Sequence, residues 1–288
     1  MKMPEDQYIK IGALQTRYWA EGINGHPVVL IHGLGGYIES WALSINSLAN
    51  NYRVYALDLP GHGLTDKPVD ISYDIETLAQ FVIEFITAIK VENAHLVGHS
   101  LGGAIATRMT IMNPEIVRKL ILVASGGLGR EVSLNLRIAS IPILGEILTK
   151  PSRSGAADFA KTLVYDLAAM PPESVELNYQ MASQPNAQQA FLKTLRATGN
   201  IFGQKRSIYG PNVNGLGTIK NSALIIWGRQ DQIVPIEHAD VADKGLPNSH
   251  LRIFDACGHL PMIEHPETFN ELLLDFLSDE ILVAPNPT

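Results

Sequence analysis

The chain has 288 residues, of which 46% are hydrophobic and 18% are charged, and its formal net charge is −7. This length suits one large domain with an inserted subdomain, and the composition is typical of a globular enzyme with a large buried core. The acidic balance disfavours nucleic acid or an anionic membrane as the main partner.

Strand-like and helix-like segments alternate through the first half of the chain. Residues 8–20 are typical of two short strands that form an edge hairpin. Apolar runs, which suit strands buried on both faces of a parallel sheet, follow at 28–31, 53–58, 94–97 and 119–124. Helical spacing occurs at 40–49, 75–89 and 103–112, and Asp74 is a candidate N-cap. This alternation predicts an α/β fold with right-handed crossovers.

The rhythm changes between residues 127 and 220. Helical pieces separated by prolines replace the strand-like runs, and they cover 154–169, 174–183 and 188–198. Two further strands at 223–228 and 251–254 and a closing helix at 268–277 come next. Because both ends of the helical segment return to the same sheet, we expect a core of residues 1–126 and 221–288 with a helical cap insertion of residues 127–220.

A nucleophile is predicted at residues 98–102, which read Gly-His-Ser-Leu-Gly. This G-x-S-x-G motif lies between a buried strand and a helix. A serine on such a turn has a strained backbone and presents its hydroxyl clear of the sheet. Glycines two residues before and after Ser100 let neighbouring backbone approach closely.

A serine hydroxyl needs a base, because it is almost never ionised at neutral pH. His259 is the best candidate among nine histidines, since it follows a strand at the edge where ligands meet an open α/β sheet. Asp231 follows residues 223–228 and is the candidate orienting acid, in the chain order that the motif implies. Asp58 and Asp255 are rival acids, but Asp58 precedes the serine and Asp255 suits a local turn.

Attack on a carbonyl creates an oxyanion that backbone N–H groups must stabilise. The amide of Leu101 directly follows the nucleophile, and the loop His-Gly-Leu-Gly-Gly at 32–36 offers the amide of Leu34. This loop lacks the G-x-G-x-x-G pattern of a nucleotide site, and the chain has no H-E-x-x-H or C-x-x-C pair. We therefore expect no nucleotide site in this loop and no metal. Cys257 is a poor rival nucleophile because it stands too close to His259 to face it.

Together these motifs resemble the α/β-hydrolase fold family over residues 28–277. The resemblance depends on residues 32–33, 58–63, 98–103, 231 and 257–259. It implies a mostly parallel eight-stranded sheet flanked by helices, a helical cap over the serine, and no cofactor.

Two branches of that family share features with this chain. Residues 66–68 and the Cys-Gly-His at 257–259, followed by 264–267, look like those of meta-cleavage-product C–C hydrolases. The Gly-His-Ser at the elbow is more typical of esterases, lipases and thioesterases, because the C–C hydrolases usually have Gly-Asn-Ser there.

The leading hypothesis is a serine hydrolase that cleaves a carboxylic ester of a small apolar substrate through an acyl-enzyme. One alternative is a C–C bond hydrolase, in which Arg196 or Lys193 of the cap could bind the substrate carboxylate. A second alternative is a small-molecule receptor that keeps the triad.

The partner is expected to be a small molecule, with no nucleic acid and no membrane span, and the protein a monomer or a homodimer. The single cysteine permits no disulfide within the chain, and the first seven residues lack the apolar segment of a secretory signal. These features favour a cytoplasmic location.

Overall fold

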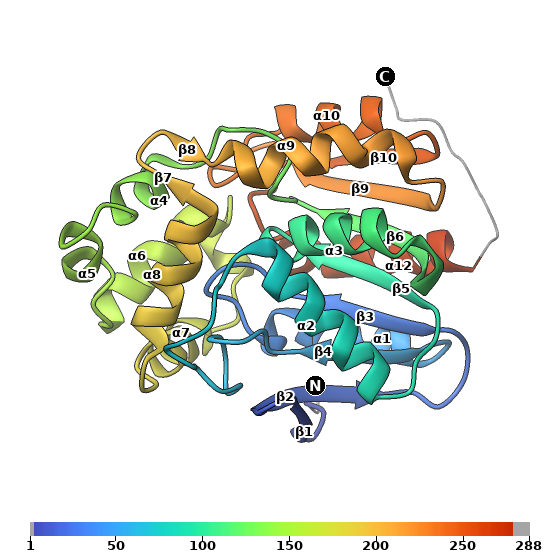
Figure 1. The fold of residues 1–288 in the computed structure, drawn as a ribbon, viewed down its shortest axis with the longest axis horizontal. Helices are drawn as coiled ribbons and strands as arrows, with labels where there is room; N and C mark the ends of the chain where they lie inside the picture. Colours follow the sequence, from blue (N-terminus) through green and yellow to red (C-terminus); the bar gives the residue numbers. More distant parts are fainter. Residues whose placement is uncertain (1–2, 279–288) are drawn as a thin grey trace.

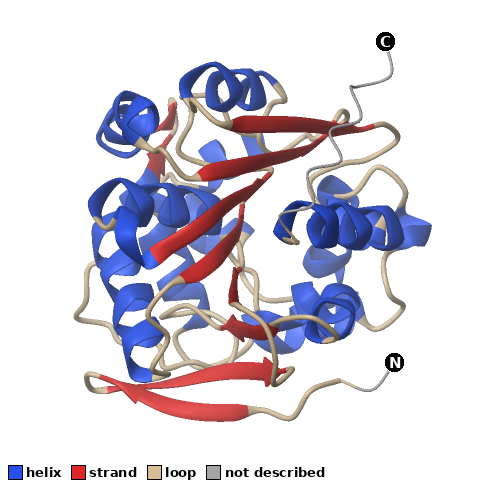
Figure 2. Ribbon diagram, turned by 90° about the vertical axis from the view of Figure 1, so that its right-hand side faces the viewer, coloured by secondary structure: helices blue, strands red, loops and turns tan. Residues whose placement is uncertain are grey.

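The computed structural model describes residues 3–278, which form an eight-stranded sheet with helices on both faces (Figures 1 and 2). The strand order is β1-β2-β4-β3-β5-β6-β9-β10. The last six strands in this order run parallel, whereas β1 and β2 form an antiparallel hairpin at one edge. The strands are β1 (Gln7–Ile11), β2 (Leu14–Glu21), β3 (Pro27–Ile31), β4 (Arg53–Leu57), β5 (Ala94–His99), β6 (Val117–Val123), β9 (Ser222–Gly228) and β10 (Ser249–Phe254). The predicted mostly parallel eight-stranded sheet is confirmed.

Each central strand is buried on both faces because its successive side chains point to opposite sides. In β5, Leu96 enters the core beneath α2 and α3, whereas Val97 enters the core beneath α1 and α12. On the first face lie α2 (Ile75–Ala88), α3 (Leu101–Met112), α9 (Arg206–Gly215) and α10 (Glu237–Gly245). On the second face lie α1 (Ala42–Ala49), α11 (Pro261–Glu264) and α12 (Pro266–Leu277). Short 3₁₀ helices are η1 (Ile38–Trp41), η2 (Pro114–Ile116), η3 (Leu167–Ala169) and η4 (Leu216–Thr218).

Helix α2 begins where the sequence predicts. The Asp74 carboxylate accepts a hydrogen bond from the backbone N–H of Thr77 at 2.8 Å, which is the geometry of an N-cap. Such a cap stabilises a helix by about 1 kcal/mol.

A helical insertion lies between β6 and β9, and Figure 1 shows it beyond one end of the sheet. Its elements are α4 (Leu134–Ala139), α5 (Leu144–Leu148), α6 (Arg153–Leu163), α7 (Ser174–Ala182), α8 (Ala187–Thr198) and the two-residue strands β7 (Gly199–Asn200) and β8 (Gly203–Gln204). Helix α9 follows these elements and packs against α3 and α10 of the core. We propose that residues 127–220 form the cap, with α9 as the part that fastens it to the core. Within residues 3–278, no helix combines the length and the apolar character that crossing a bilayer requires.

Helix α6 ends six residues earlier than the sequence predicts. Beyond Leu163 the chain is extended and bonds to the loop that holds His259, whose N–H donates to the Leu163 carbonyl at 2.7 Å. A helix through residues 164–169 would withdraw that carbonyl from the loop, so this tertiary contact fixes the helix end.

Candidate active site

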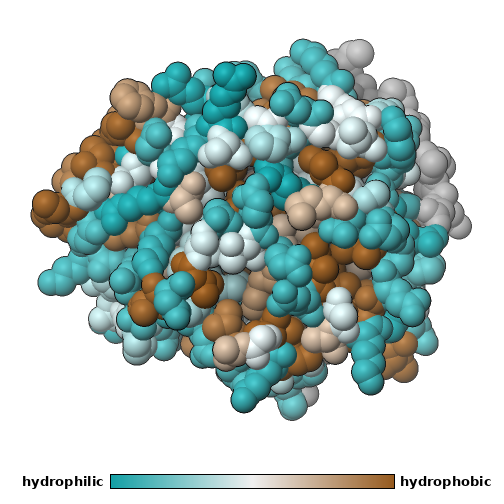
Figure 3. Space-filling view, in the orientation of Figure 1, coloured by the Kyte–Doolittle hydropathy of each residue, from teal (hydrophilic) through white to brown (hydrophobic). Residues whose placement is uncertain are grey.

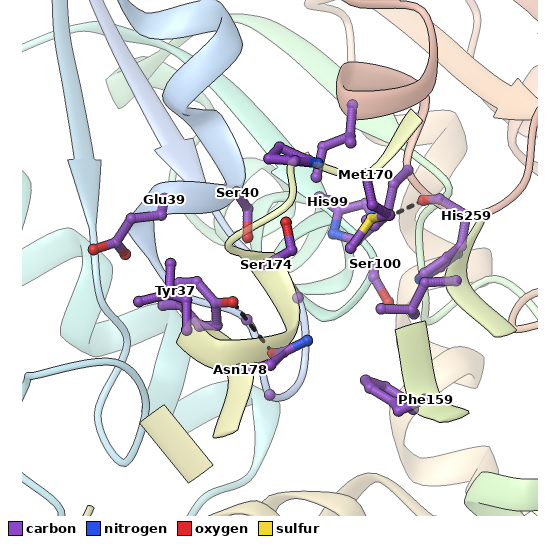
Figure 4. A pocket seen from close by; sticks show the side chains of 18 of the residues that line it. Tyr37, Glu39, Ser40, His99, Ser100, Phe159, Met170, Ser174, Asn178 and His259 are labelled. Carbon is purple, nitrogen blue, oxygen red and sulfur yellow. Dashed lines mark hydrogen bonds between the residues drawn. The ribbon is translucent and has the colours of Figure 1, made fainter. Parts of the chain in front are cut away.

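Three side chains from distant parts of the sequence meet at one edge of the sheet. Ser100 follows β5, Asp231 follows β9 and His259 follows β10, and the carboxyl ends of parallel strands share an edge. The Nδ1 atom of His259 lies 2.7 Å from Oδ2 of Asp231. Ser100 and His259 both line a cavity of about 320 Å³ beneath the cap (Figure 4). The structure therefore brings Asp231 against His259, and His259 and Ser100 to one cavity, and that the three act together as a triad stays a prediction.

The backbone of Ser100 is strained, with φ of 53° and ψ of −115°. A non-glycine residue held in such a conformation costs about 1–3 kcal/mol. Its N–H donates to the Val123 carbonyl at 2.9 Å, and its carbonyl accepts from Gly126 at 2.8 Å, so the neighbouring β6 holds the turn in place. A Cβ atom on Gly98 would lie 2.4 Å from the Gly102 carbonyl oxygen, so this turn requires glycine there.

The Asp231 carboxylate is fully buried and its two oxygens have different partners. One oxygen accepts from the backbone N–H groups of Ile233 at 2.8 Å and Val234 at 3.0 Å. The other accepts the proton on Nδ1 of His259. This arrangement leaves Nε2 of His259 as the nitrogen that can accept a proton from a hydroxyl.

The rival acids have other roles. Asp58 is fully buried and accepts from the backbone N–H groups of Ile38 and Leu64, each at 2.8 Å, and from Arg17. Burial raises the pKa of Asp58 to about 7. Asp255 is exposed and pairs with Arg229. Asp58 therefore joins the loops after β3 and β4, and Asp255 stabilises a surface turn.

Cys257 is buried, with its Sγ against a carboxylate oxygen of Glu264, and burial raises the pKa of this thiol. A thiol that resists ionisation is a poor nucleophile. Among residues 3–278, no group of three or more His, Cys, Asp or Glu side chains is arranged to hold a metal ion.

Glu264 contributes to the site in a way that the sequence did not predict. One of its oxygens accepts from the N–H of Gly258 at 2.7 Å, and the other accepts from the N–H of Tyr165 at 2.6 Å. This carboxylate thus ties the His259 loop to the cap. Its place five residues after His259 was visible in the sequence, but its partner Tyr165 is 99 residues away.

His99 supports the loop from the other side. Its Nε2–H donates to the carbonyl oxygen of His259 at 2.9 Å, and the two rings lie 4.6 Å apart. Burial lowers the pKa of His99 well below its ordinary value, so this ring stays neutral. His99 therefore shapes the surroundings of the nucleophile and carries no charge of its own.

The loop after β3 presents the candidate oxyanion donors. Leu34 lines the cavity beside Ser100, and Leu101 is the first residue of α3, so its N–H has no partner within the helix. His32 fixes this loop, because Nδ1 donates to the Gly33 carbonyl at 2.7 Å and Nε2 accepts from Leu59 N–H at 3.0 Å. Burial lowers the pKa of His32 to about 3, so the ring is neutral.

The cavity is mainly apolar. Its polar lining residues include Tyr37, whose hydroxyl donates to Asn178 at 3.2 Å (Figure 4), Glu39, whose carboxylate pairs with Arg17, and Glu173. The apolar lining residues include Leu34, Leu43, Leu136, Phe159, Leu163, Met170, Leu177, Leu260 and Ile263. A second cavity of about 210 Å³ adjoins the first, and the two share Gly35, Gly36, Phe159 and Asn178 as lining residues.

No Lys or Arg of the described residues lines the cavity that holds Ser100. Arg196 forms an ion pair with Glu146 at 2.7 Å and also donates to the Ser140 carbonyl. The ammonium of Lys193 donates to the Val69 carbonyl. The two cations that the sequence offered for a substrate carboxylate are therefore engaged elsewhere.

A family model described as "alpha/beta hydrolase fold" matches residues 26–266. The chain belongs to the α/β-hydrolase fold family. This α/β hydrolase is 32% identical to the 2-hydroxy-6-oxononadienedioate/2-hydroxy-6-oxononatrienedioate hydrolase of Paraburkholderia phymatum, over 92% of this chain and 91% of the relative.

Two similar solved structures share this fold but are named for different activities. The meta-cleavage product hydrolase CumD of Pseudomonas fluorescens has a TM-score of 0.82 and 27% identity, over 95% of this chain and 98% of that chain. A putative lipase of Acinetobacter baumannii has a TM-score of 0.83 and 26% identity, over 95% of this chain and 91% of that chain. The relatives thus support the C–C hydrolase alternative better than the ester hydrolysis that the sequence placed first. What they establish for this chain is the coarser activity, a serine hydrolase of the α/β fold.

Proposed function

We propose that the protein hydrolyses a bond next to a carbonyl group, with Ser100 as nucleophile, His259 as base and Asp231 as the orienting acid. The single observation that carries this proposal is the hydrogen bond of 2.7 Å between His259 and Asp231, beside the cavity that Ser100 also lines. In the first step Nε2 of His259 takes the hydroxyl proton while Ser100 attacks the carbonyl carbon. The amides of Leu34 and Leu101 stabilise the oxyanion that forms.

For the bond itself, we propose C–C cleavage as the first candidate. The relative from P. phymatum supports it, since the two chains match over more than nine tenths of their lengths. In this reaction His259, once protonated, delivers its proton to the carbon that leaves. The carbon leaves with the electron pair of the broken bond, which a conjugated carbonyl must take up as an enolate or dienolate, so the substrate is expected to be a ketone with a second, conjugated carbonyl. Water then releases the acyl group from Ser100.

Ester hydrolysis is the second candidate, and one observation favours it. The P. phymatum relative is named for a dioate, which has two carboxylates, and a carboxylate removed from water needs a cationic or hydrogen-bonding partner. This cavity is lined by Glu39, which pairs with Arg17, and by Glu173 but by no Lys or Arg of the described residues. The lysines Lys67 and Lys150 line the adjoining cavity instead. A neutral ester needs no such partner, and it fits the mainly apolar wall.

One pair of assays separates the two candidates. The purified protein is given a coloured 2-hydroxy-6-oxodienoate and, separately, p-nitrophenyl butyrate, and each is repeated with Ser100→Ala. C–C cleavage predicts a kcat/KM for the dienoate at least about 100-fold above that for the ester, a transition-state difference of about 2.7 kcal/mol. The reverse ratio would select ester hydrolysis. Equal turnover by wild type and Ser100→Ala on the preferred substrate would reject both hydrolase candidates. Tight binding of a substrate without turnover would favour the alternative of a small-molecule receptor.

A further inference from the structure

The cap exposes a cluster of large apolar side chains around α5. Ile143 is 76% exposed, Leu144 37%, Ile147 66% and Leu148 56%, and we name these four residues the α5 patch. Figure 3 shows hydrophobic surface at the edge of the molecule where Figure 1 places α5. Single exposed apolar residues are ordinary, but a contiguous patch marks a surface that meets a partner.

The α5 patch does little for the packing of the cap. The core of the cap is made by Ala139, Leu192 and Leu195, without any residue of the patch. Helix α5 is instead held by polar contacts, since Glu146 pairs with Arg196 and its carbonyl accepts from Gln188. The four side chains therefore point outward from a helix that is fixed by other means.

Ile143 adds a second sign of an external role. Its φ is 70° and its ψ is −51°, a conformation that strains a β-branched residue and that glycine would occupy at less cost. A residue that is both strained and exposed contributes little to folding. Its apolar side chain is better explained by a partner that contacts it.

The charge of the cap identifies the chemistry of that partner. Residues 127–220 contain ten Lys and Arg against six Asp and Glu, so the cap has a formal charge of +4 in a chain whose total is −7. Lys150 lies two residues after α5, is exposed, and forms no ion pair with any residue of 3–278. Apolar side chains beside cations suit the interface of an anionic bilayer, where the apolar groups enter the acyl boundary and the cations meet the headgroups. The net acidity of the whole chain conceals this local surface.

The α5 patch is also continuous with the path to the nucleophile. Leu148 of the patch and Lys150 line the second cavity, which shares Phe159 with the cavity of Ser100. An apolar substrate that leaves a bilayer at α5 would therefore enter the protein beside Leu148. From there it reaches Ser100 along an apolar wall.

We propose that the α5 patch docks the cap on the surface of an anionic lipid bilayer, from which the active-site cavity receives apolar substrate. This inference goes beyond the proposed function, and it does not depend on which bond Ser100 cleaves. Docking is peripheral, through side chains of one short helix and Lys150 beside it.

The test is sedimentation with vesicles, without any substrate. Wild type is mixed with vesicles of equal parts phosphatidylglycerol and phosphatidylcholine, or with vesicles of phosphatidylcholine alone. The test variant is Ile143→Asn/Ile147→Gln, which replaces two apolar side chains of the patch that line neither cavity by polar ones. The matched control is Ile23→Asn, since Ile23 is 88% exposed on the turn after β2, outside the cap.

We expect wild type and Ile23→Asn to bind the anionic vesicles about equally. The double variant is expected to bind them at least about tenfold more weakly. Binding to phosphatidylcholine alone is expected to be weaker for all three. Unchanged thermal unfolding and unchanged hydrolysis of p-nitrophenyl butyrate in the double variant would show that the loss is not misfolding. Equal binding by wild type and double variant, or no binding by wild type, would overturn the proposal. So would a wild-type dimer that the double variant lacks, because the patch would then join two copies of the chain.

Discussion

Asp231 presents one carboxylate oxygen to the amides of Ile233 and Val234 and the other to Nδ1 of His259 at 2.7 Å. The loop thus holds the acid in one orientation before any substrate is bound. Because the carboxylate accepts the Nδ1 proton, Nε2 is left unprotonated toward the cavity, and this tautomer is the one that a general base requires.

Asp231→Asn tests this relationship with little change of shape. The amide can still accept from Ile233 and Val234, but its NH₂ would donate to Nδ1 and move the proton to Nε2. We expect kcat to fall by about 10³–10⁴-fold, with thermal unfolding near that of wild type. Asp255→Asn is the matched control, since Asp255 is an exposed acid of the neighbouring loop and should keep full activity. A fall of less than tenfold in Asp231→Asn would show that another residue orients His259.

Gly33→Ala tests the close approach of the oxyanion loop to the nucleophile. A Cβ atom on Gly33 would lie 2.9 Å from Cβ of Ser100, so the loop or the serine must move. We expect kcat to fall by about 100-fold, the cost of losing one oxyanion donor. Gly217→Ala is the control because a Cβ atom there meets nothing within 4 Å. Full activity in Gly33→Ala would exclude this loop from the catalytic geometry.

The strain at Ser100 predicts a gain in stability when it is released. Ser100→Gly can adopt φ of 53° freely, whereas Ser100→Ala keeps a Cβ atom and most of the strain. We expect both variants to be inactive. Relief of about 1 kcal/mol predicts that Ser100→Gly unfolds about 2–4 °C above Ser100→Ala. A differential scanning measurement with the order reversed would contradict a strained elbow.

Glu264→Gln tests whether the link between the cap and the His259 loop positions the base. The carboxylate accepts from the N–H groups of both Gly258 and Tyr165. The single amide oxygen of glutamine can accept from only one of them. We expect kcat to fall by about tenfold or more with little change in KM, because a misplaced base acts on the transition state. Glu267→Gln, in the exposed first turn of α12, is the control. Equal losses in kcat for both variants would mean that the Glu264 bridge has no special role.

The fold should lose stability in acid because of buried histidines. Burial lowers the pKa of His62 to about 4, below the value of about 6.5 in an unfolded chain, so the unfolded state takes up a proton first as the pH falls. The contribution of neutral His62 is therefore complete above pH 6.5 and is lost toward pH 4, by about 2 kcal/mol at pH 5. Urea unfolding at pH 8 and pH 5 should show a smaller difference in His62→Asn than in wild type. An unchanged difference would place the acid sensitivity elsewhere.

The sequence predicts the parts of the structure that depend on local pattern. Unbroken apolar runs mark strands covered on both faces, as Leu96 and Val97 show in β5. Ser100 and Asp231 each follow such a run, His259 follows the half-buried edge strand β10, and parallel strands then bring the three to one edge. The rest of the site depends on contacts between distant segments. Glu264 accepts a hydrogen bond from Tyr165, 99 residues away, and no local sequence pattern around either residue predicts this contact.

The helices that the sequence did not predict lack a clear apolar face. In α10 the buried apolar residues, Ala239 and Ala242, are small, and α9 contains Gly210 and Pro211, which disfavour a helix until α3 packs against it. Helix α5 is short, and its apolar side chains face outward, which is the reverse of the usual pattern. The lining of the cavity also could not be predicted from composition, since the two cations that the sequence offers for the substrate are engaged elsewhere, Arg196 by Glu146 of the cap and Lys193 by the Val69 carbonyl of the core.

The central claim is that Ser100 is the nucleophile, and trapping of the acyl group tests it most directly. Wild type is quenched with acid during turnover of p-nitrophenyl butyrate or labelled with a fluorophosphonate, and its peptides are analysed by mass spectrometry. We expect one adduct per chain, on the peptide that contains Ser100, and none in Ser100→Ala. An adduct on another residue, or turnover by Ser100→Ala at the rate of wild type, would contradict it.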